Sequence, residues 1–300
     1  MEEFELSIVM VTYKCREVFK VSLDALIDSN TKFRFEIIVI DNDSRDGTAE
    51  MVEKEFKVGE WEERFQLVRN SNVGFPKANN QGLKLMRGRY ALLLNPDTKV
   101  SPDTLQVMMD FMKARPDVGI STCKLIKANG ELDKACRRTI PTPFVAFARL
   151  SGLSILFPNS KLFAKYNLSY KNENDETEVD ACSGAFMFAS PNALRDVGPM
   201  DERFYMYGED LDWCLAVKEM GHKVWYYPKT TTVHYRGQSS KKSSVRSLYA
   251  FHDAMWLFFR KHFSRNYWYV LDPFVWVGVW ARFVVKLVMN KFRSEPYISK

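Results

Sequence analysis

Three carboxylates lie within four residues in the stretch Met206-Tyr207-Gly208-Glu209-Asp210-Leu211-Asp212-Trp213-Cys214. A carboxylate among aromatic side chains has a raised pKa and can act as a general base toward a hydroxyl group. The same acids suit the start of a helix, because free N–H groups and the helix dipole favour negative charge there. Glu209, Asp210 and Asp212 are therefore candidates both for catalysis and for helix capping.

Polar side chains also follow four apolar runs in the first hundred residues. They are Thr12 after 7–11, Asp41 to Asp43 after 35–40, Asn72 to Asn79 after 65–68, and Asn95 to Asp97 after 90–94. A carboxylate at such a point can accept from a base N–H or a ribose hydroxyl, or ligate a divalent cation that carries a diphosphate. His234, after the run 231–233, could add a nitrogen ligand or a phosphate contact, or be a plain polar residue.

The apolar runs predict the elements that position these residues. Helical periodicity separates each run from the next, and strand–helix alternation over the first 115 residues favours an α/β fold. We expect a mostly parallel central sheet with helices on both faces, and ligands bind at the carboxyl ends of such strands. Neither a G-x-G-x-x-G after the first strand nor a P-loop motif occurs, which argues against dinucleotide and P-loop chemistry.

The pattern changes after residue 117. Runs at 120–126 and 132–137 flank Asn129-Gly130 and predict a hairpin, whereas 141–177 has no clear period and reads as a variable loop or short helices. We divide the chain into a unit at 1–240, with halves 1–117 and 118–240, and a helical tail at 241–300.

Composition favours a soluble, enzyme-sized fold in a reducing compartment. The chain has 300 residues, 46% of them hydrophobic, and five cysteines without a C-x-x-C pair. No secretory signal precedes the first run, so we expect a cytoplasmic location. Residues 241–300 carry eleven Lys or Arg and three acids, a balance of +8, so residues 1–240 carry −2 of the total of +6. A neutral body with a basic, aromatic tail fits a membrane surface and argues against nucleic acid.

The last predicted helix, 274–293, is amphipathic. Arg282, Lys286 and Arg293 form a basic stripe on an otherwise apolar helix. The uncharged run from 273 to 281 falls far short of the roughly 20 residues needed to span a bilayer. We expect this helix to lie on a membrane surface, although it could instead cover a core or a dimer partner.

Five ordered motifs between residues 6 and 240 resemble family 2 glycosyltransferases of the GT-A fold. They are Ile8-Val9-Met10-Val11-Thr12-Tyr13, the segment 37–48, Asn72-Val73-Gly74-Phe75 with Ala78-Asn79-Asn80, Leu94-Asn95-Pro96-Asp97, and Asp201-Glu202 through Asp212. The chain is most similar to the rhamnosyltransferase branch, in which Asn-Pro-Asp stands where other members have Asp-x-Asp.

The resemblance implies a nucleotide-sugar site in the first half. Thr12, Asp41 and Asn42 would hold the pyrimidine base and ribose, with Asn79 nearby, and either Asp41 or Asn42 would meet the base edge. Asn95 stands in place of the first acid of Asp-x-Asp.

The resemblance also implies a metal site. Asp97 would bind Mg²⁺ or Mn²⁺, His234 would help to hold the metal or the diphosphate, and Arg236 could meet phosphate.

Asp210 matches the catalytic base of the family, which deprotonates the acceptor hydroxyl as that oxygen attacks C1 with inversion. Residues assigned to the acceptor are Glu209 and Asp212, for which helix capping stays an alternative, together with Asp180, Ser183 and Gly184.

The resulting hypothesis is an inverting, metal-dependent transferase at the cytoplasmic face of the cell membrane. It would move L-rhamnose from dTDP-rhamnose onto a polyprenyl-linked glycan. Rival readings are the same chemistry with a UDP-hexose or UDP-galactofuranose donor, and a nucleotide-sugar-binding scaffold without turnover. A homodimer stays open.

Overall fold

The computed structural model describes residues 3–236 and 244–292. Within these residues, nine strands form one sheet in the order β3-β2-β1-β4-β8-β6-β9-β5, with β7 paired to β9. The strands are β1 Leu6–Thr12, β2 Phe35–Asn42, β3 Phe65–Asn70, β4 Tyr90–Leu94, β5 Thr98–Val100, β6 Val118–Ile126, β7 Thr177–Val179, β8 Phe186–Ala189 and β9 Lys223–His234.

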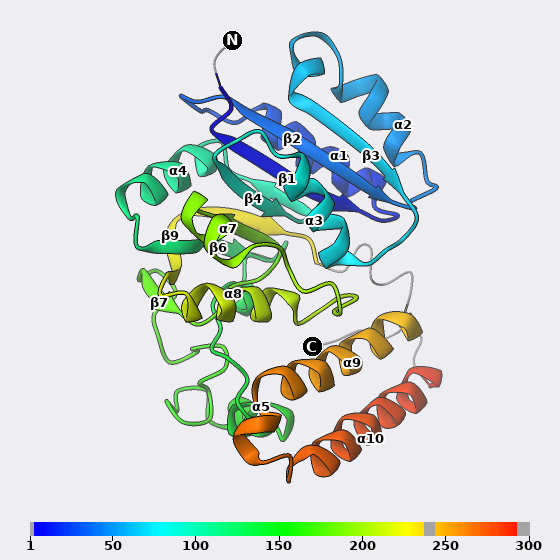
Figure 1. Ribbon diagram of the computed structural model, residues 1–300, viewed down its shortest axis with the longest axis vertical. Helices are drawn as coiled ribbons and strands as arrows, with labels where there is room; N and C mark the ends of the chain where they lie inside the picture. Colours follow the sequence, from blue (N-terminus) through cyan, green and yellow to red (C-terminus); the bar gives the residue numbers. More distant parts are fainter. Residues whose placement is uncertain (1–2, 237–243, 293–300) are drawn as a thin grey trace.

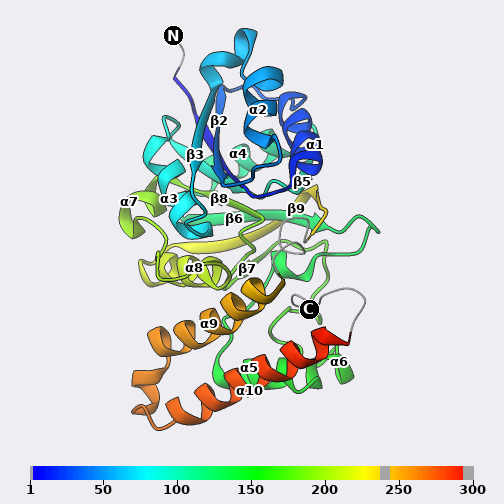
Figure 2. The ribbon, with the colours of Figure 1, turned by 90° about the vertical axis from the view of Figure 1, so that its right-hand side faces the viewer.

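Helices pack on both faces of this sheet (Figures 1 and 2). In Figure 2, α3 and α7 lie on one side and α1 and α2 on the other. The α-helices are α1 Arg16–Ile27, α2 Thr48–Met51, α3 Phe75–Leu85, α4 Thr104–Ala114, α5 Pro143–Leu150, α6 Leu153–Leu156, α7 Pro191–Val197, α8 Glu209–Glu219, α9 Ser244–His262 and α10 Asp272–Lys291. Short 3₁₀ or π turns are η1 Val52–Phe56, η2 Gly59–Arg64, η3 Lys134–Cys136 and η5 Ser264–Tyr267.

The first half is the predicted parallel sheet. Strands β1, β2, β3 and β4 pair in parallel, and every residue of β1 and β2 is buried. Their continuous apolar character follows from the helices that cover both faces. β1 lies between β2 and β4, so the strand order reverses there and the carboxyl ends of these strands diverge to leave room for a ligand.

The second half is mixed rather than parallel. β8 runs antiparallel to both β4 and β6, whereas β6 and β9 are parallel. The run 231–233 is the end of one longer strand, β9, whose ladder with β6 is irregular between Tyr226 and Thr231. Pro228 lies in that gap and has no N–H for the ladder.

The predicted hairpin at 120–137 is wrong in its second strand. The turn is present, with Gly130 at φ +82° and the Lys127 N–H donating to the Glu131 carbonyl. Beyond it, Leu132 makes an isolated bridge to Ile126, and the chain enters η3, which the Asp133 side chain caps. A buried capping carboxylate thus stands where a strand was expected.

The tail folds into an antiparallel pair of helices, α9 and α10, at one end of the molecule (Figure 1). Its predicted basic stripe does not all face outward, because the Arg282 guanidinium lies 2.9 Å from His252 Nε2 and over the Phe251 ring. Arg293 lies outside the described residues. No helix of the described segments has the length and apolarity needed to cross a membrane.

Candidate active site

The end of β1 and the end of β2 join through two buried side chains. The register pairs Thr12 with Asp41, and Thr12 Oγ1 donates to Asp41 Oδ1 at 3.0 Å. This bond fixes the orientation of the Asp41 carboxyl at the carboxyl edge of the sheet. A carboxylate held there can accept from a base N–H or from a ribose hydroxyl.

The Asn42 side chain, unlike that of Asp41, bonds to the loop that follows β3. Its amide donates to Asn72 Oδ1 at 3.2 Å, and its Oδ1 accepts from the Val73 N–H at 3.1 Å. The side chain therefore holds the 72–74 loop against the end of β2. Asn79, buried in α3, donates to the Phe75 carbonyl at 2.9 Å and so fastens the first turn of that helix.

The segment after β4 meets the end of β9. β5 pairs with β9 so that Thr98 lies opposite His234, and the Tyr235 N–H donates to the Asp97 carbonyl. His234 Nε2 lies 3.3 Å from Asp97 Oδ1, and both residues are buried. The Asn95 Oδ1 atom close by in the chain is buried without a hydrogen-bond partner.

Asp133, which sequence reasoning missed, orients this histidine. It is fully buried, and its Oδ2 lies 2.8 Å from His234 Nδ1 and 2.9 Å from Arg236 Nε. Burial lowers the pKa of His234, but the bonds to Asp133 and Asp97 outweigh it and raise that pKa to about 9. Arg236 is thereby fixed beside the Asp97–His234 pair. A lone acid after a turn carries no local signal for this role.

Asp210 sits at the start of α8 in a polar cradle. Its Oδ2 accepts from Arg138 Nη2 at 2.7 Å and from the Gly184 N–H at 3.1 Å, and its Oδ1 accepts from the Leu211 N–H at 2.8 Å. Arg138 is buried and also donates to the Cys182 carbonyl. The three bonds to Asp210 fix the position of its carboxylate, as a general base toward a hydroxyl requires.

Strand pairing brings this carboxylate beside the Asn95–Asp97 segment. β8 pairs with β4 so that Phe186 lies opposite Leu94, and the Asn95 N–H donates to the Ala185 carbonyl at 3.1 Å. Gly184, one residue earlier, contacts Asp210, and a Cβ at that position would lie 3.8 Å from the Asp210 Cβ. The strand-end groups and the candidate base therefore share one edge of the sheet.

Glu209 is the acid with the perturbed pKa. Its Oε2 atom is buried without a hydrogen-bond partner. Burial, and next the charge of Asp210, raise the pKa of Glu209 to about 8. The raised pKa that the sequence suggested for the acidic cluster thus falls on Glu209.

Neither Glu209 nor Asp212 is the N-cap residue of α8, which is Gly208 at φ +78°. Both lie in the first turn, where the helix dipole favours negative charge. Asp212 also binds the tail: its Oδ1 lies 2.7 Å from Lys261 Nζ and 2.7 Å from His262 Nε2. Asp212 is thus part of the contact between α8 and α9.

The other predicted acceptor residues lie close to Arg138 in the chain's packing, since the Asp180 N–H donates to the Arg138 carbonyl at 3.1 Å. Asp180 Oδ1 pairs with Lys218 Nζ at 2.6 Å, and its Oδ2 accepts from the Ile140 N–H. Ser183 Oγ accepts from the Ala185 N–H at 3.2 Å, which shapes the turn that presents the Gly184 N–H to Asp210.

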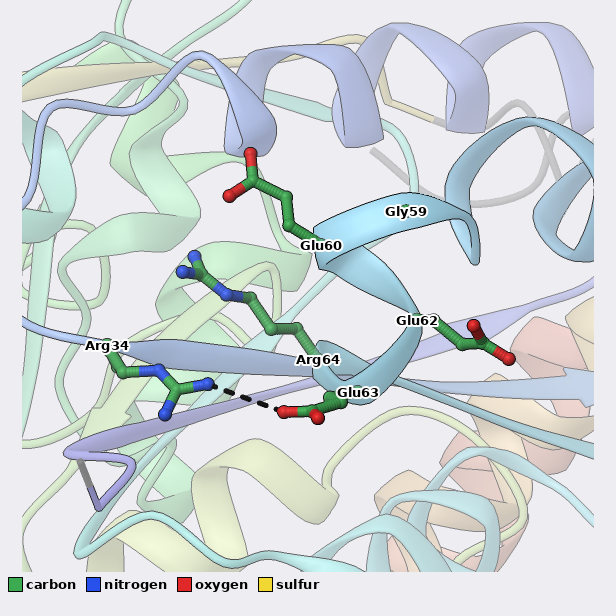
Figure 3. Close-up of a pocket in the computed structure, with 6 residues that line it drawn as sticks. All are labelled: Arg34, Gly59, Glu60, Glu62, Glu63 and Arg64. Carbon is green, nitrogen blue, oxygen red and sulfur yellow. Dashed lines mark ion pairs between the residues drawn. The ribbon is translucent and has the colours of Figure 1, made fainter. Parts of the chain in front are cut away.

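A surface pocket of about 790 Å³ lies elsewhere, between Arg34 and the turn η2 (Figure 3). Glu63 and Arg34 face each other across it at 3.8 Å. These residues precede β2 and β3, so the pocket lies at the amino ends of the strands. The polar groups described above are at the carboxyl ends, where parallel sheets bind ligands, and we place the candidate active site there.

Solved structures with the same fold define the class. The mannosyltransferase PcManGT from Pyrobaculum calidifontis, in complex with GDP-Man and Mn²⁺, superposes with a TM-score of 0.57 at 15% identity, covering 96% of this chain and 76% of that one. S. aureus TarS 1–349 in complex with UDP-GlcNAc gives 0.54 at 17% identity, over 85% of this chain and 65% of that one. The fold is that of the GT-A glycosyltransferases.

Sequence comparison names the family. The pattern of glycosyl transferase family 2 matches residues 7–192, and the chain belongs to this family. An N-acetylglucosaminyl-diphospho-decaprenol L-rhamnosyltransferase of Mycobacterium tuberculosis is 23% identical over 264 residues, which is 84% of this chain and 83% of the relative. The rhamnosyltransferase WbbL of Escherichia coli is 23% identical over 54% of this chain and 61% of its own length.

Proposed function

We propose that this chain is an inverting, metal-dependent glycosyltransferase that moves L-rhamnose from dTDP-rhamnose to a hydroxyl of a polyprenyl-linked glycan. The observation that carries the proposal is the Asp210 carboxylate, oriented by Arg138 and Gly184 beside the segment that leads to Asp97. The similarity to the mycobacterial rhamnosyltransferase supports the donor sugar and the lipid-linked acceptor.

In the proposed step, Asp210 removes the proton of the acceptor hydroxyl. The oxygen forms a bond to C1 of the sugar from the face opposite the nucleotide, the bond between C1 and the diphosphate oxygen breaks, and the diphosphate leaves with that electron pair. The configuration at C1 inverts. The bonds from Arg138 and Gly184 aim the carboxylate before the acceptor arrives, so little reorganisation is needed during the reaction.

Asp97 and His234 fit a divalent cation. They offer one oxygen and one nitrogen 3.3 Å apart, and Asp133 holds the other ring nitrogen of His234, as second partners of metal-binding histidines do. No three His, Cys, Asp or Glu side chains converge on one point in the described ranges, so the diphosphate would supply further ligands. When bound, Mg²⁺ or Mn²⁺ supplies positive charge for the leaving diphosphate. Mn²⁺ is named with the similar PcManGT structure, which supports this assignment.

On the donor side, Thr12 and Asp41 would meet the base or ribose, while Asn42 holds the 72–74 loop beside them. Asn79 would support that loop through α3, and Arg236, fixed beside His234, would meet a phosphate.

Transfer assays test the mechanism. Asp210→Asn is nearly isosteric and should lower kcat by about 10²–10⁴-fold with donor binding retained, because only the proton acceptor is lost. Asp97→Ala should instead lose most of the transfer activity, and added metal should no longer stimulate what remains. Near wild-type transfer by either variant would refute the mechanism.

A panel of dTDP-rhamnose, UDP-hexoses and UDP-galactofuranose, followed by release of nucleoside diphosphate, tests the donor. Preference for a UDP-sugar would replace rhamnose in the proposal, and absence of turnover with every donor would favour a binding scaffold.

The tail would rest on the cytoplasmic face of the cell membrane. From 273 to 289, the exposed residues of α10 are all uncharged, and they include Phe274, Trp276 and Val277. Such a face suits the boundary between headgroups and acyl chains. Vesicle binding should therefore fall when the chain is cut at about residue 262. Unchanged binding after truncation would leave the tail as a cover for a core or a second copy.

A further inference from the structure

A second apolar surface lies outside the tail, on the segment from α5 to residue 163. Thr142 caps α5 and Pro143 opens it, so the helix is well defined. Its small residues Val145 and Ala148 point inward and are buried. Its large residues point outward: Phe144, Phe147 and Leu150 are 46–60% exposed. A helix that buries its small apolar residues and exposes its large ones has its main apolar face directed away from the protein.

The exposed surface continues through α6. Ile155 is 80% exposed, Leu156 71% and Phe157 51%. The ring of Phe163 lies beneath this surface, with its centroid 5.6 Å from that of Phe157 and 6.4 Å from that of Phe144. The outward side chains thus form one supported patch rather than scattered surface residues.

The charge of this segment identifies its partner. Residues 139–172 contain four Lys or Arg and no Asp or Glu, and Lys161 and Lys165 are exposed beside the apolar patch. Apolar side chains flanked by cations match an anionic bilayer, in which acyl chains lie beneath negative headgroups. The occupant we infer is therefore a lipid surface.

The position of the patch in the molecule also agrees with a lipid surface as its partner. α5 and α6 lie at the same end of the molecule as α10, although more than a hundred residues separate them in the chain (Figures 1 and 2). Two apolar surfaces from remote parts of the sequence thus project at one end. The segment starts five residues after Arg138, the partner of Asp210, so its docking would bring the acceptor side of the site toward the lipid.

We propose that residues 143–163 insert into an anionic membrane as a contact separate from the tail. The proposal concerns lipid binding alone and does not depend on the donor or on the transfer reaction.

Site-specific labelling tests it in the full chain. All five native cysteines are buried, so Leu156→Cys introduces a uniquely reactive thiol for an environment-sensitive nitrobenzoxadiazole dye. Val58→Cys is the matched control, since Val58 is 49% exposed and lies next to η2 at the amino ends of the strands. With phosphatidylglycerol vesicles, the dye at 156 should gain intensity and shift to the blue, whereas the dye at 58 should not change.

A charge test follows the same design. Ile155→Asp with Leu156→Asp should weaken vesicle binding at least about tenfold, or about 1.4 kcal/mol, whereas Val58→Asp should leave it unchanged. The proposal is overturned if the dye at 156 keeps its aqueous emission on vesicle-bound protein, since the tail alone would then dock. A shift that needs no vesicles and grows with protein concentration would assign the patch to a second copy, and absence of all vesicle binding would overturn it too. Donor turnover, measured in parallel, reports separately on the proposed function.

Discussion

The buried acid Glu209 should make the stability of this protein fall as the pH rises. Its carboxyl is neutral in the folded protein up to a pH of about 8, whereas in the unfolded chain it ionises above its ordinary pKa of 4.5. Between these two values the folded state binds more protons than the unfolded state, so the free energy of unfolding decreases with rising pH across this window. Glu209→Gln keeps the shape and removes the titration.

The magnitude follows from the two pKa values. At about 1.4 kcal/mol for each pH unit between 4.5 and about 8, ionisation in the folded state costs about 5 kcal/mol. When the pH rises from 4.5 to 8.5, the free energy of unfolding of the Gln variant should increase by up to that amount relative to the wild type. If the free energy of unfolding falls by about 3 kcal/mol per M urea, the difference between the urea midpoints of the two proteins should change by about 1.5 M from pH 4.5 to pH 8.5.

Urea unfolding of both proteins at pH 4.5, 6.5 and 8.5 measures this. Other groups, such as His234, titrate alike in both proteins, so only the difference between them reports on Glu209. Glu209→Gln and wild type with parallel pH dependence would show that Glu209 is ionised and solvated in the folded state, and the assignment of a neutral acid beside Asp210 would fail.

Three further changes probe the framework of the site. Arg138→Met should cost about 3–5 kcal/mol in urea unfolding because it leaves the Asp210 charge without its buried partner, and a loss below about 1 kcal/mol would contradict the pairing. Gly74→Ala should cost at least about 1–3 kcal/mol, since residue 74 has φ +92° and an added Cβ would lie 2.6 Å from the Tyr205 carbonyl oxygen; an unchanged melting temperature would argue against this contact. Lys261→Met should speed amide exchange at the end of α9 roughly fivefold by removing an ion pair of about 1 kcal/mol, whereas equal rates would mean that Lys261 does not help to hold α9.

The parallel half of the fold was predictable because its signals are local. β1, β2, β3 and β4 each contain an apolar run, and the helices between them have clear periodicity. β5, with three residues, and α7, with seven, are too short for a period to stand out. The run 231–233 did not reveal the full length of β9, because Pro228 interrupts the ladder of that strand.

The site was predictable only in part, for a related reason. Residues at strand ends, such as Asp41 and Asp97, are marked by the runs before them. Their partners come from irregular segments: Asp133 follows a turn, and Arg138 lies between the short turn η3 and a stretch without a period. Which side chain such a segment presents depends on tertiary packing, and spacing in the chain does not encode it. The aromatic residues around the acidic cluster did indicate burial, but not which acid is buried without a partner.

The contact between α8 and α9 has a mechanical consequence. Asp210 and Asp212 stand two residues apart in α8, one held by Arg138 and the other by Lys261 and His262. The helix is therefore held at two points within its first turn. A displacement of α9 would act through Asp212 on the same helical turn that positions Asp210. The position of the tail is therefore coupled to the orientation of the Asp210 carboxylate.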